Sequence, residues 1–279
     1  DFLAHAYRSW RAPAPSYVVL MGDGHYDPKN HQYSRSSYLP PYLAVIAPWM
    51  EETAADNRYV TLVGDDTLPD MMLGRLAVNT RVQASAFVDK IIGYEQAPPG
   101  DWQRQVLAVA DNPDLGANFA AMSDDLLACC LPGPYQAEKV HFRATHATVS
   151  DARSAIQSGI NTGKLIVNYI GHAYTQAWAA ENLLTTADVP LLQNADRLPV
   201  VVAMTCREGY YHYPFPVAQG REALAEVSTR ADGKGAVASW SPTGVGLTTG
   251  HRYLDRGFFR AVFQDGVGTL GEATTAGKL

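Results

Sequence analysis

The sequence has few cysteines, which limits its covalent chemistry. Three occur in 279 residues, at Cys129, Cys130 and Cys206. Three cysteines cannot all pair, and a chain of this size does not need disulfides to be stable. Cys129 and Cys130 are neighbours in a predicted helix, where adjacent side chains are poorly placed to bridge each other, so we interpret them as buried thiols. Cysteine usage leaves the redox compartment open.

Other absences exclude whole classes of protein. No apolar run approaches the ~20 residues that span a bilayer, and we recognise no signal peptide. The net charge is −6, without a cluster of lysine and arginine, which argues against a nucleic-acid partner. The turn Gly22-Asp23-Gly24 lacks the Lys-Ser/Thr pair and the further glycine of nucleotide-binding loops. The sequence therefore predicts no membrane span, no nucleic-acid binding and no nucleotide chemistry.

What is present is the composition of an ordered globular protein with alternating strand and helix patterns. Hydrophobic residues make up 47% and charged residues 18%, which suits a chain that buries a sizeable core. The alternation predicts a mostly parallel sheet covered by helices on both faces. The predicted strands are 17–21, 60–63, 105–110, 140–142, 165–172, 198–206 and 235–240, and the predicted helices are 2–10, 80–96, 119–131, 149–158, 188–194, 222–229 and 258–263.

A Pro-Pro-Gly sequence at 98–100 interrupts this pattern. We place a boundary between two α/β subdomains there. Residues 1–104 form a non-catalytic N-terminal subdomain and residues 105–279 a catalytic one. Because the first residues, from Asp1, already carry a helical pattern, we expect the chain to be part of a longer, multidomain polypeptide.

Two apolar runs end in residues suited to nucleophilic chemistry. The run 165–172 ends at His172 and the run 198–206 ends at Cys206. If these runs are neighbouring parallel strands, both side chains emerge at the carboxyl edge of the sheet, where open α/β sheets place reactive groups. A thiol and an imidazole there can act as nucleophile and base. A lone cysteine or histidine is more often structural, but the joint placement beside glycines favours chemistry.

The residues around these strand ends carry a family resemblance. The sequence Asn-Tyr-Ile-Gly-His at 168–172 is similar to the Asn-Tyr-x-Gly-His-Gly strand end of the gingipain-type cysteine peptidases, relatives of the caspases, and Cys-Arg-Glu-Gly at 206–209 resembles their Cys-x-x-Gly. The resemblance extends in order over nearly the whole chain and includes 17–27, 64–66, 74–76, 90–102, 108–112 and 177–178. It implies a caspase-like α/β fold of two stacked subdomains and a cysteine endopeptidase that forms a thioester acyl-enzyme.

The resemblance also implies catalytic roles. Cys206 attacks an acyl carbonyl, and His172 takes the thiol proton and later protonates the leaving amine. Asp111 stands where gingipains carry a glutamate that orients the histidine. It is one methylene shorter, and a turn residue in Asp-Asn-Pro is an equal alternative. The backbone N–H groups of Cys206 and Ala173 would hold the oxyanion. Ala173 replaces the family's glycine and disfavours a positive φ.

Substrate-binding residues follow from the same resemblance. Arginine-cleaving gingipains carry an aspartate at the start of the helix after the third strand, and Asn118 occupies that place here, with Asp114 and Asp124 nearby. An uncharged asparagine cannot neutralise a buried guanidinium, so strict arginine specificity is not expected. The other cleft candidates are Trp240, Ser239, Trp178 and Tyr210, and for each aromatic ring ordinary core packing is an alternative.

The chemistry requires no cofactor, but structural calcium is a hypothesis. Gly64-Asp65-Asp66 is an oxygen-rich turn of the kind that can bind Ca²⁺, and gingipain-like enzymes carry such ions, although no EF-hand pattern occurs. Asp23, His25 and Asp27 alternate as a metal site could, but we interpret them as a polar loop. The metal ligands remain unassigned.

The resemblance implies a secreted or cell-surface protein that acts on a protein or peptide substrate. Two alternatives stay open. One is a sortase-type transpeptidase of the same family, in which an amine rather than water resolves the thioester. The other is a non-catalytic, calcium-stabilised cell-surface module with vestigial catalytic residues.

Overall fold

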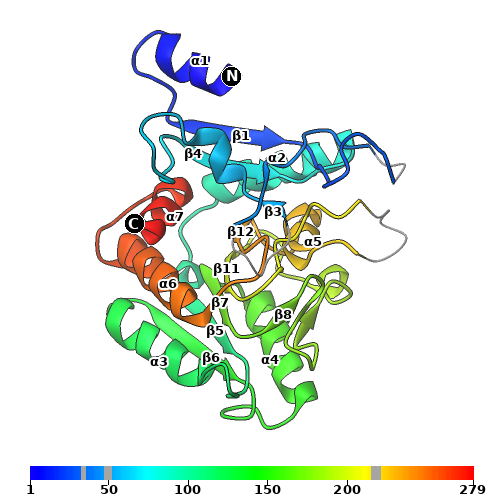
Figure 1. Ribbon diagram of the computed structural model, residues 1–279. Coiled ribbons are helices and arrows are strands. Elements are labelled where there is room, and N and C mark those ends of the chain that lie inside the picture. Colours follow the sequence, from blue (N-terminus) through cyan, green and yellow to red (C-terminus); the bar gives the residue numbers. More distant parts are fainter. Residues whose placement is uncertain (33–35, 47–51, 215–220) are drawn as a thin grey trace.

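A five-stranded parallel sheet forms the centre of the molecule (Figure 1). The computed structural model describes residues 1–32, 36–46, 52–214 and 221–279. The strand order is β12-β11-β7-β5-β6, and each pair is parallel. The strands are β5 (Gln105–Ala110), β6 (Gln136–His141), β7 (Ile166–Ile170), β11 (Val200–Met204) and β12 (Ala238–Trp240).

Helices cover both faces of this sheet. Every residue of β7 is buried, as expected of a strand enclosed on both sides. Alternate residues of β5, β7 and β11 contribute to two separate hydrophobic cores. One core includes α4 (Val149–Thr162) and α5 (Leu224–Arg230), and the other includes α3 (Phe119–Cys130), α6 (Thr248–Phe263) and α7 (Leu270–Lys278). The predicted mostly parallel sheet with helices on both faces is confirmed.

Short elements fill the connection between β7 and β11. A small antiparallel sheet of order β10-β9-β8 forms there, followed by a single 3-10 turn, η3. The predicted helix 188–194 is therefore wrong, because only η3 is helical. The elements are β8 (Ala173–Tyr174), β9 (Ala177–Trp178), β10 (Leu184–Thr185) and η3 (Val189–Leu191).

The N-terminal half forms two small sheets of its own. β1 pairs in parallel with β4, and β2 pairs antiparallel with β3. The elements are α1 (Phe2–Ser9), β1 (Tyr17–Met21), β2 (Leu43–Ala44), β3 (Thr53–Ala54), η1 (Asp56–Val60), β4 (Met72–Leu76), α2 (Arg81–Gln96) and η2 (Asp101–Arg104). The predicted strand 60–63 is wrong, since Val60 ends a 3-10 helix.

The two halves of the chain pack against each other. Helix α7 lies against β4, and α2 lies against α5. Figure 1 shows α7 from the C-terminal end of the chain beside β4 from the N-terminal half. No helix within the described ranges combines the length and apolar character needed to cross a membrane.

The end of α3 differs from expectation. Cys129 and Cys130, interpreted from the sequence as free buried thiols, are joined by a disulfide. Cys130 is buried and Cys129 is exposed. The helix ends at Cys130, and the next residue, Leu131, is extended, so the constraint of regular helix geometry does not continue past this pair. Cys206 is the free cysteine.

Candidate active site

His172 and Cys206 lie at equivalent places on neighbouring strands. β7 and β11 are paired, with Ile170 opposite Met204. Each candidate side chain follows two residues later. Because parallel strands end at the same edge of a sheet, the imidazole and the thiol share the carboxyl edge.

Gly171 allows the tight approach of this edge to β5. A Cβ atom at position 171 would lie 2.4 Å from the Asp111 Cβ and 2.7 Å from the Tyr169 hydroxyl oxygen. Real Cβ atoms do not approach this closely. Glycine is therefore required here by packing.

Asp111 holds the backbone of His172. Its Oδ2 accepts a hydrogen bond from the His172 N–H at 3.2 Å, and its Oδ1 accepts one from the Asn112 N–H at 2.8 Å. The side chain is buried at the end of β5, and this burial raises the pKa of the Asp111 carboxyl. The structure thus places Asp111 on the histidine's main chain, with no hydrogen bond to its ring in the described part of the chain.

The imidazole contacts a different aspartate. His172 Nε2 lies 2.8 Å from Asp114 Oδ2, and the ring packs edge-on against Phe119 at 5.3 Å between centroids. A hydrogen bond from the Gly116 N–H is the main cause that lowers the pKa of Asp114, and the bond to His172 adds to it. The sequence argument named Asp114 only as a neighbour of the substrate pocket. Its place in the loop that leaves the carboxyl end of β5 is the signal that could have indicated this contact.

The His172 carbonyl is fixed as well. It accepts hydrogen bonds from the Tyr169 hydroxyl at 2.5 Å and from the Ala179 N–H at 2.8 Å. Together with Asp111 on the N–H, these contacts determine where the backbone of His172 lies. The ring is half exposed, with 55% of the side-chain surface accessible, so the imidazole keeps freedom to turn.

Cys206 is a half-buried thiol in a loop that rests on the segment after β12. Its Sγ lies 3.8 Å from the carbonyl oxygen of Gly246. Arg207 follows with φ 57°, a left-handed conformation unusual for a non-glycine residue, and its N–H donates to Gly244 at 2.9 Å. Across the ranges that the structure describes, no hydrogen bond joins Cys206 to His172. Sequence reasoning did not identify this supporting segment.

Ala173 takes a conformation that alanine readily adopts. It lies in β8 and is absent from the positive-φ residues of the described chain. Ala173 pairs with Trp178 in the β8–β9 ladder. In the neighbouring pair, the Ala179 N–H donates a hydrogen bond to the His172 carbonyl. Because bonded and non-bonded pairs alternate in an antiparallel ladder, the Ala173 N–H points away from β9. The substitution of the family's glycine therefore costs no backbone strain here.

Two of the predicted cleft aromatics pack against other rings, and one of them is fully buried. Trp178 is 1% exposed and stacks on Tyr169 with 4.4 Å between ring centroids. A ring enclosed in the core cannot touch a substrate, so the structure corrects this assignment. Trp240 packs against Phe258 at 5.3 Å, beneath α6.

The remaining predicted binding residues lie in three different segments. Asn118 is the N-cap of α3, where its side-chain oxygen accepts a hydrogen bond from the Ala121 N–H at 3.1 Å. Ser239 lies in β12, and its hydroxyl is 2.5 Å from that of Ser241. Tyr210 is half-buried and stacks on His212 at 3.8 Å.

Glu208 is a buried acid that sequence reasoning did not single out. It lies two residues after Cys206 and is 1% exposed. Burial raises the pKa of Glu208 to about 7, partly offset by hydrogen bonds from Ser241 and Trp178. The Trp178 Nε1 lies 3.4 Å from its Oε1. Trp178 thus connects the loop of the thiol to Tyr169, which holds the backbone of His172.

The described residues contain no group of three or more histidine, cysteine, aspartate or glutamate side chains placed to hold a metal ion. Asp65 and Asp66 are exposed, and Asp66 accepts a hydrogen bond from the Leu68 N–H in its own turn. The turn at 64–66 therefore does not form a cage of ligands in this structure.

A free thiol and an imidazole at adjacent strand ends of a parallel sheet, with helices on both faces, define the caspase-like class of cysteine-type peptidases. The sequence matches the model of peptidase family C25 over residues 1–279. The chain belongs to this family and is a gingipain-like, cysteine-type member.

Known relatives agree with this assignment. Lys-gingipain of Porphyromonas gingivalis is 26% identical over 184 residues, which cover 64% of this chain and 10% of that protein. Gingipain R2 of the same species is 26% identical over 226 residues, covering 78% of this chain and 27% of the relative. The chain therefore spans between a tenth and about a quarter of these relatives.

A solved relative shows the fold. The crystal structure of the Arg-specific cysteine proteinase gingipain R superposes with a TM-score of 0.74 at 21% identity, covering 99% of this chain and 60% of the other. A complex of gingipain pro- and mature domains from Porphyromonas gingivalis superposes with a TM-score of 0.75 at 21% identity, covering 99% and 62%. The caspase-like fold predicted from the sequence is confirmed.

Proposed function

We propose that this chain is a cysteine endopeptidase domain in which Cys206 is the nucleophile and His172 is its general base. The observation that carries the proposal is the register of β7 and β11, which sets both side chains two residues beyond a directly paired position at one sheet edge. The substrate is a protein or peptide.

The reaction proceeds through a thioester. His172 takes the Sγ proton, and the thiolate attacks the peptide carbonyl to form a C–S bond and a tetrahedral oxyanion. The oxyanion collapses, the C–N bond breaks, and the imidazolium gives its proton to the leaving amine. Water then attacks the thioester with His172 as base, which releases the acid and restores the thiol of Cys206.

Asp114 is the group that orients the imidazole. Its carboxylate is 2.8 Å from Nε2, which leaves Nδ1 as the nitrogen that accepts the thiol proton. A carboxylate on one ring nitrogen and a nucleophile on the other is the arrangement by which catalytic triads steady an imidazolium. Hydrogen bonds between a nucleophile and its base are often long in free enzymes and shorten with substrate bound. The half-exposed ring can rotate toward Cys206 to form this bond.

Two backbone N–H groups form the oxyanion site. The Ala173 N–H points out of the β8–β9 ladder, on the residue that follows the base. The Cys206 N–H is on the nucleophile itself. Removal of one such donor in other enzymes costs about 10²–10³ in rate, so the extended conformation of Ala173 supports an active rather than a vestigial site.

We do not expect strict arginine specificity. Asn118 is uncharged, and its side-chain oxygen already caps α3. We infer further that the chain works within a longer, secreted or cell-surface polypeptide. The much greater length of its relatives supports this, as does the pro- and mature-domain complex solved for a gingipain.

Labelling with a library of peptide acyloxymethyl ketones tests the proposal. We expect an adduct on Cys206, located by mass spectrometry, which is absent in Cys206→Ala and lost or strongly slowed in His172→Ala. The preferred peptide would define the specificity. An amine added during turnover would reveal transpeptidation as an amide product. Absence of any adduct on folded wild type, with and without calcium, would show an inert module and refute the proposal.

A further inference from the structure

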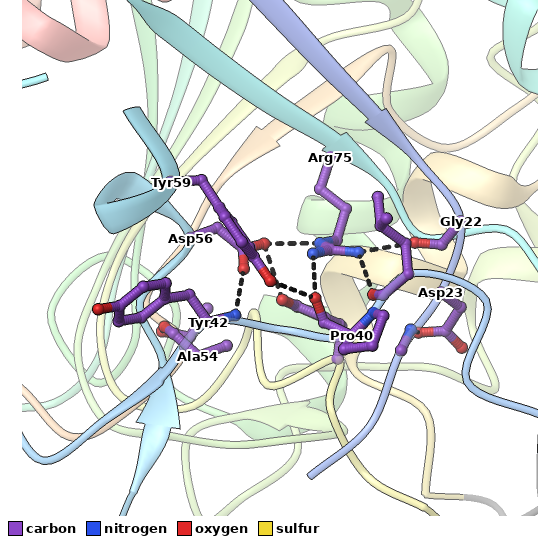
Figure 2. A network of polar contacts seen from close by, with 12 residues as sticks. Gly22, Asp23, Pro40, Tyr42, Ala54, Asp56, Tyr59 and Arg75 are labelled. Carbon is purple, nitrogen blue, oxygen red and sulfur yellow. Dashed lines mark hydrogen bonds and ion pairs between the residues drawn. The ribbon is translucent and has the colours of Figure 1, made fainter. Parts of the chain in front are cut away.

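One buried arginine in the N-terminal half forms hydrogen bonds with several segments of that half. Arg75 lies in β4, and its side chain is 7% exposed. Its Nε donates to Asp56 Oδ2 at 2.6 Å, and its Nη1 donates to the carbonyl oxygens of Gly22 at 2.8 Å and Leu39 at 2.9 Å. Figure 2 shows the guanidinium between Asp56 on one side and Gly22 on the other. The segments at the end of β1, at 39–40 and at the start of η1 thus all contact the Arg75 side chain.

The contacts of Arg75 and Asp56 extend to the loop that follows Cys206. The Tyr211 hydroxyl donates to Asp56 Oδ2 at 2.7 Å, and the Arg75 guanidinium lies over the Tyr211 ring at 4.7 Å. Tyr211 is buried and only five residues after the nucleophile. Its N–H donates to Gly209 at 2.8 Å, so the chain between Cys206 and Tyr211 is tightly turned.

A second contact supports the other side of this loop. The Thr53 hydroxyl donates to the Thr243 carbonyl at 2.6 Å, and the Thr243 hydroxyl donates to the Ala54 carbonyl at 2.6 Å. Thr243 belongs to the segment 242–246, whose carbonyls accept from the N–H groups of Arg207 and Gly209. The N-terminal half therefore supports the loop of Cys206 at two places, through Tyr211 and through the segment 242–246.

The buried pair of Arg75 and Asp56 is better suited to fixing the positions of neighbouring segments than to adding stability. Removal of a guanidinium and a carboxylate from water is costly, and a buried ion pair often gives little net stability over apolar packing. What a planar guanidinium supplies is fixed direction toward several acceptors at once. Here those acceptors come from separate segments, and one of them also binds the loop of Cys206.

We propose that Arg75 and Asp56 are positioning residues for the nucleophile, acting through the Tyr211 hydroxyl and assisted by the Thr53–Thr243 contact. The inference rests on the proposed role of Cys206. It assigns to the N-terminal half a part in catalysis, although the proposed nucleophile, base and orienting aspartate all lie in the other half.

The test compares two hydroxyl deletions in the same network. Tyr211→Phe removes the bond to Asp56 and keeps the ring under Arg75. Tyr59→Phe is the matched control, since its hydroxyl donates to the Pro40 carbonyl at 3.0 Å and does not touch the loop of Cys206. The readouts are the rate of alkylation by iodoacetamide, kcat and KM on a labelled peptide, and Tm. Cys206 is the free cysteine, so alkylation reports on it alone.

We expect Tyr211→Phe to lower kcat by about 5- to 100-fold, since small displacements of a nucleophile cost this much, with KM within about twofold. Alkylation should slow by at least threefold, while Tyr59→Phe changes neither rate. Thr243→Val should act like Tyr211→Phe, and Thr243→Ser should restore the rates. Equal rates in Tyr211→Phe and Tyr59→Phe would overturn the inference. Alkylation tests it even in a chain without peptidase activity, which separates its failure from failure of the proposed function.

Discussion

At the scale of single residues, the backbone beside His172 is tightly packed. Gly171→Ala places a Cβ atom 2.4 Å from the Asp111 Cβ. We expect a loss of about 1–3 kcal/mol in the free energy of unfolding, as in other overpacked cores, and a loss of kcat because His172 is displaced. Urea unfolding and peptide turnover measure both. Gly133→Ala is the control, since nothing lies within 4 Å of its added Cβ. Unchanged turnover in Gly171→Ala would contradict the packing argument.

Substitutions of the two aspartates near His172 should differ in effect, one lowering stability and the other lowering kcat. Asp111 is buried and accepts from two backbone N–H groups, so Asp111→Ala should lower the free energy of unfolding by about 1–3 kcal/mol. Asp114 is exposed and contacts the ring, so Asp114→Ala should change stability by less than about 0.5 kcal/mol while kcat falls. Paired denaturation and kinetic measurements check this. If Asp114→Ala kept full kcat, its orienting role would be wrong.

Residues at strand ends could be predicted from the sequence, and residues in loops could not. Cys206 and His172 follow long β-branched runs, so their shared edge follows from parallel pairing. Asp114 reaches the imidazole through a loop conformation that no pattern encodes. Trp178 lies in a two-residue strand, which is too short for its alternation to show which side faces the core.

At the scale of elements, one buried amide connects the two strands that carry the candidate dyad. Asn168 Nδ2, from β7, donates to Val202 in β11 at 3.2 Å and lies 3.0 Å from each carboxyl oxygen of Asp255 in α6. Burial raises the pKa of Asp255 to about 8. The folded protein therefore holds the Asp255 proton more tightly than the unfolded chain. The stability that this proton contributes is complete below about pH 4 and is lost as the pH rises through about 8.

Asp255→Asn should flatten the pH dependence of stability. The variant lacks the titration, so its free energy of unfolding should fall less than that of wild type between pH 7 and 9. Some decline remains, because burial also raises the pKa of Glu208 and Glu226. Urea midpoints at pH 7, 8 and 9 measure the difference. His251, whose pKa burial lowers, titrates below this window. Parallel curves for the two proteins would contradict the assignment to Asp255.

Helices and strands could be predicted from the sequence where the apolar pattern continued over many residues. Four strands of the central sheet and α2 to α4 follow from runs or repeats of apolar positions, whereas the sequence indicates only 140–142 in place of β6 (Gln136–His141). The strands β2, β3, β8, β9 and β10 have two residues each, which is too few for an alternation to be visible. Helix α7 was missed because its sequence, Leu-Gly-Glu-Ala-Thr-Thr-Ala-Gly-Lys, is poor in large apolar residues and packs through small ones.

At the scale of the whole molecule, a second buried cation joins the two halves. Lys90, in α2, is 6% exposed, and its Nζ lies 2.7 to 3.4 Å from four carbonyl oxygens around the end of α5. Lys90→Met keeps the length of the side chain and removes the ammonium group that these carbonyls share. We expect a loss of about 2–4 kcal/mol in the free energy of unfolding and faster proteolysis near 97–100. Exposed Lys29→Met is the control, and equal stability of the two variants would contradict this role.

Contacts between the halves could not be predicted from the sequence. Tyr211 and Asp56 are 155 residues apart, and Thr53 and Thr243 are 190 apart. Periodicity and turn chemistry are local signals, so they indicate elements and not which distant elements meet. The resemblance to a family supplied the fold, but the residues that join the halves had to be found in three dimensions.

The long separation of these contacts has a consequence for how the protein is made. A ribosome delivers Asp56 and Arg75 first, the nucleophile much later, and the 242–246 segment near the end of the described chain. Domains generally acquire their structure as units during synthesis, and here the loop of Cys206 is supported by residues that lie far before it and by residues that lie after it in the sequence. A growing chain therefore exposes the Cys206 thiol before the 242–246 segment that contacts its loop has been made.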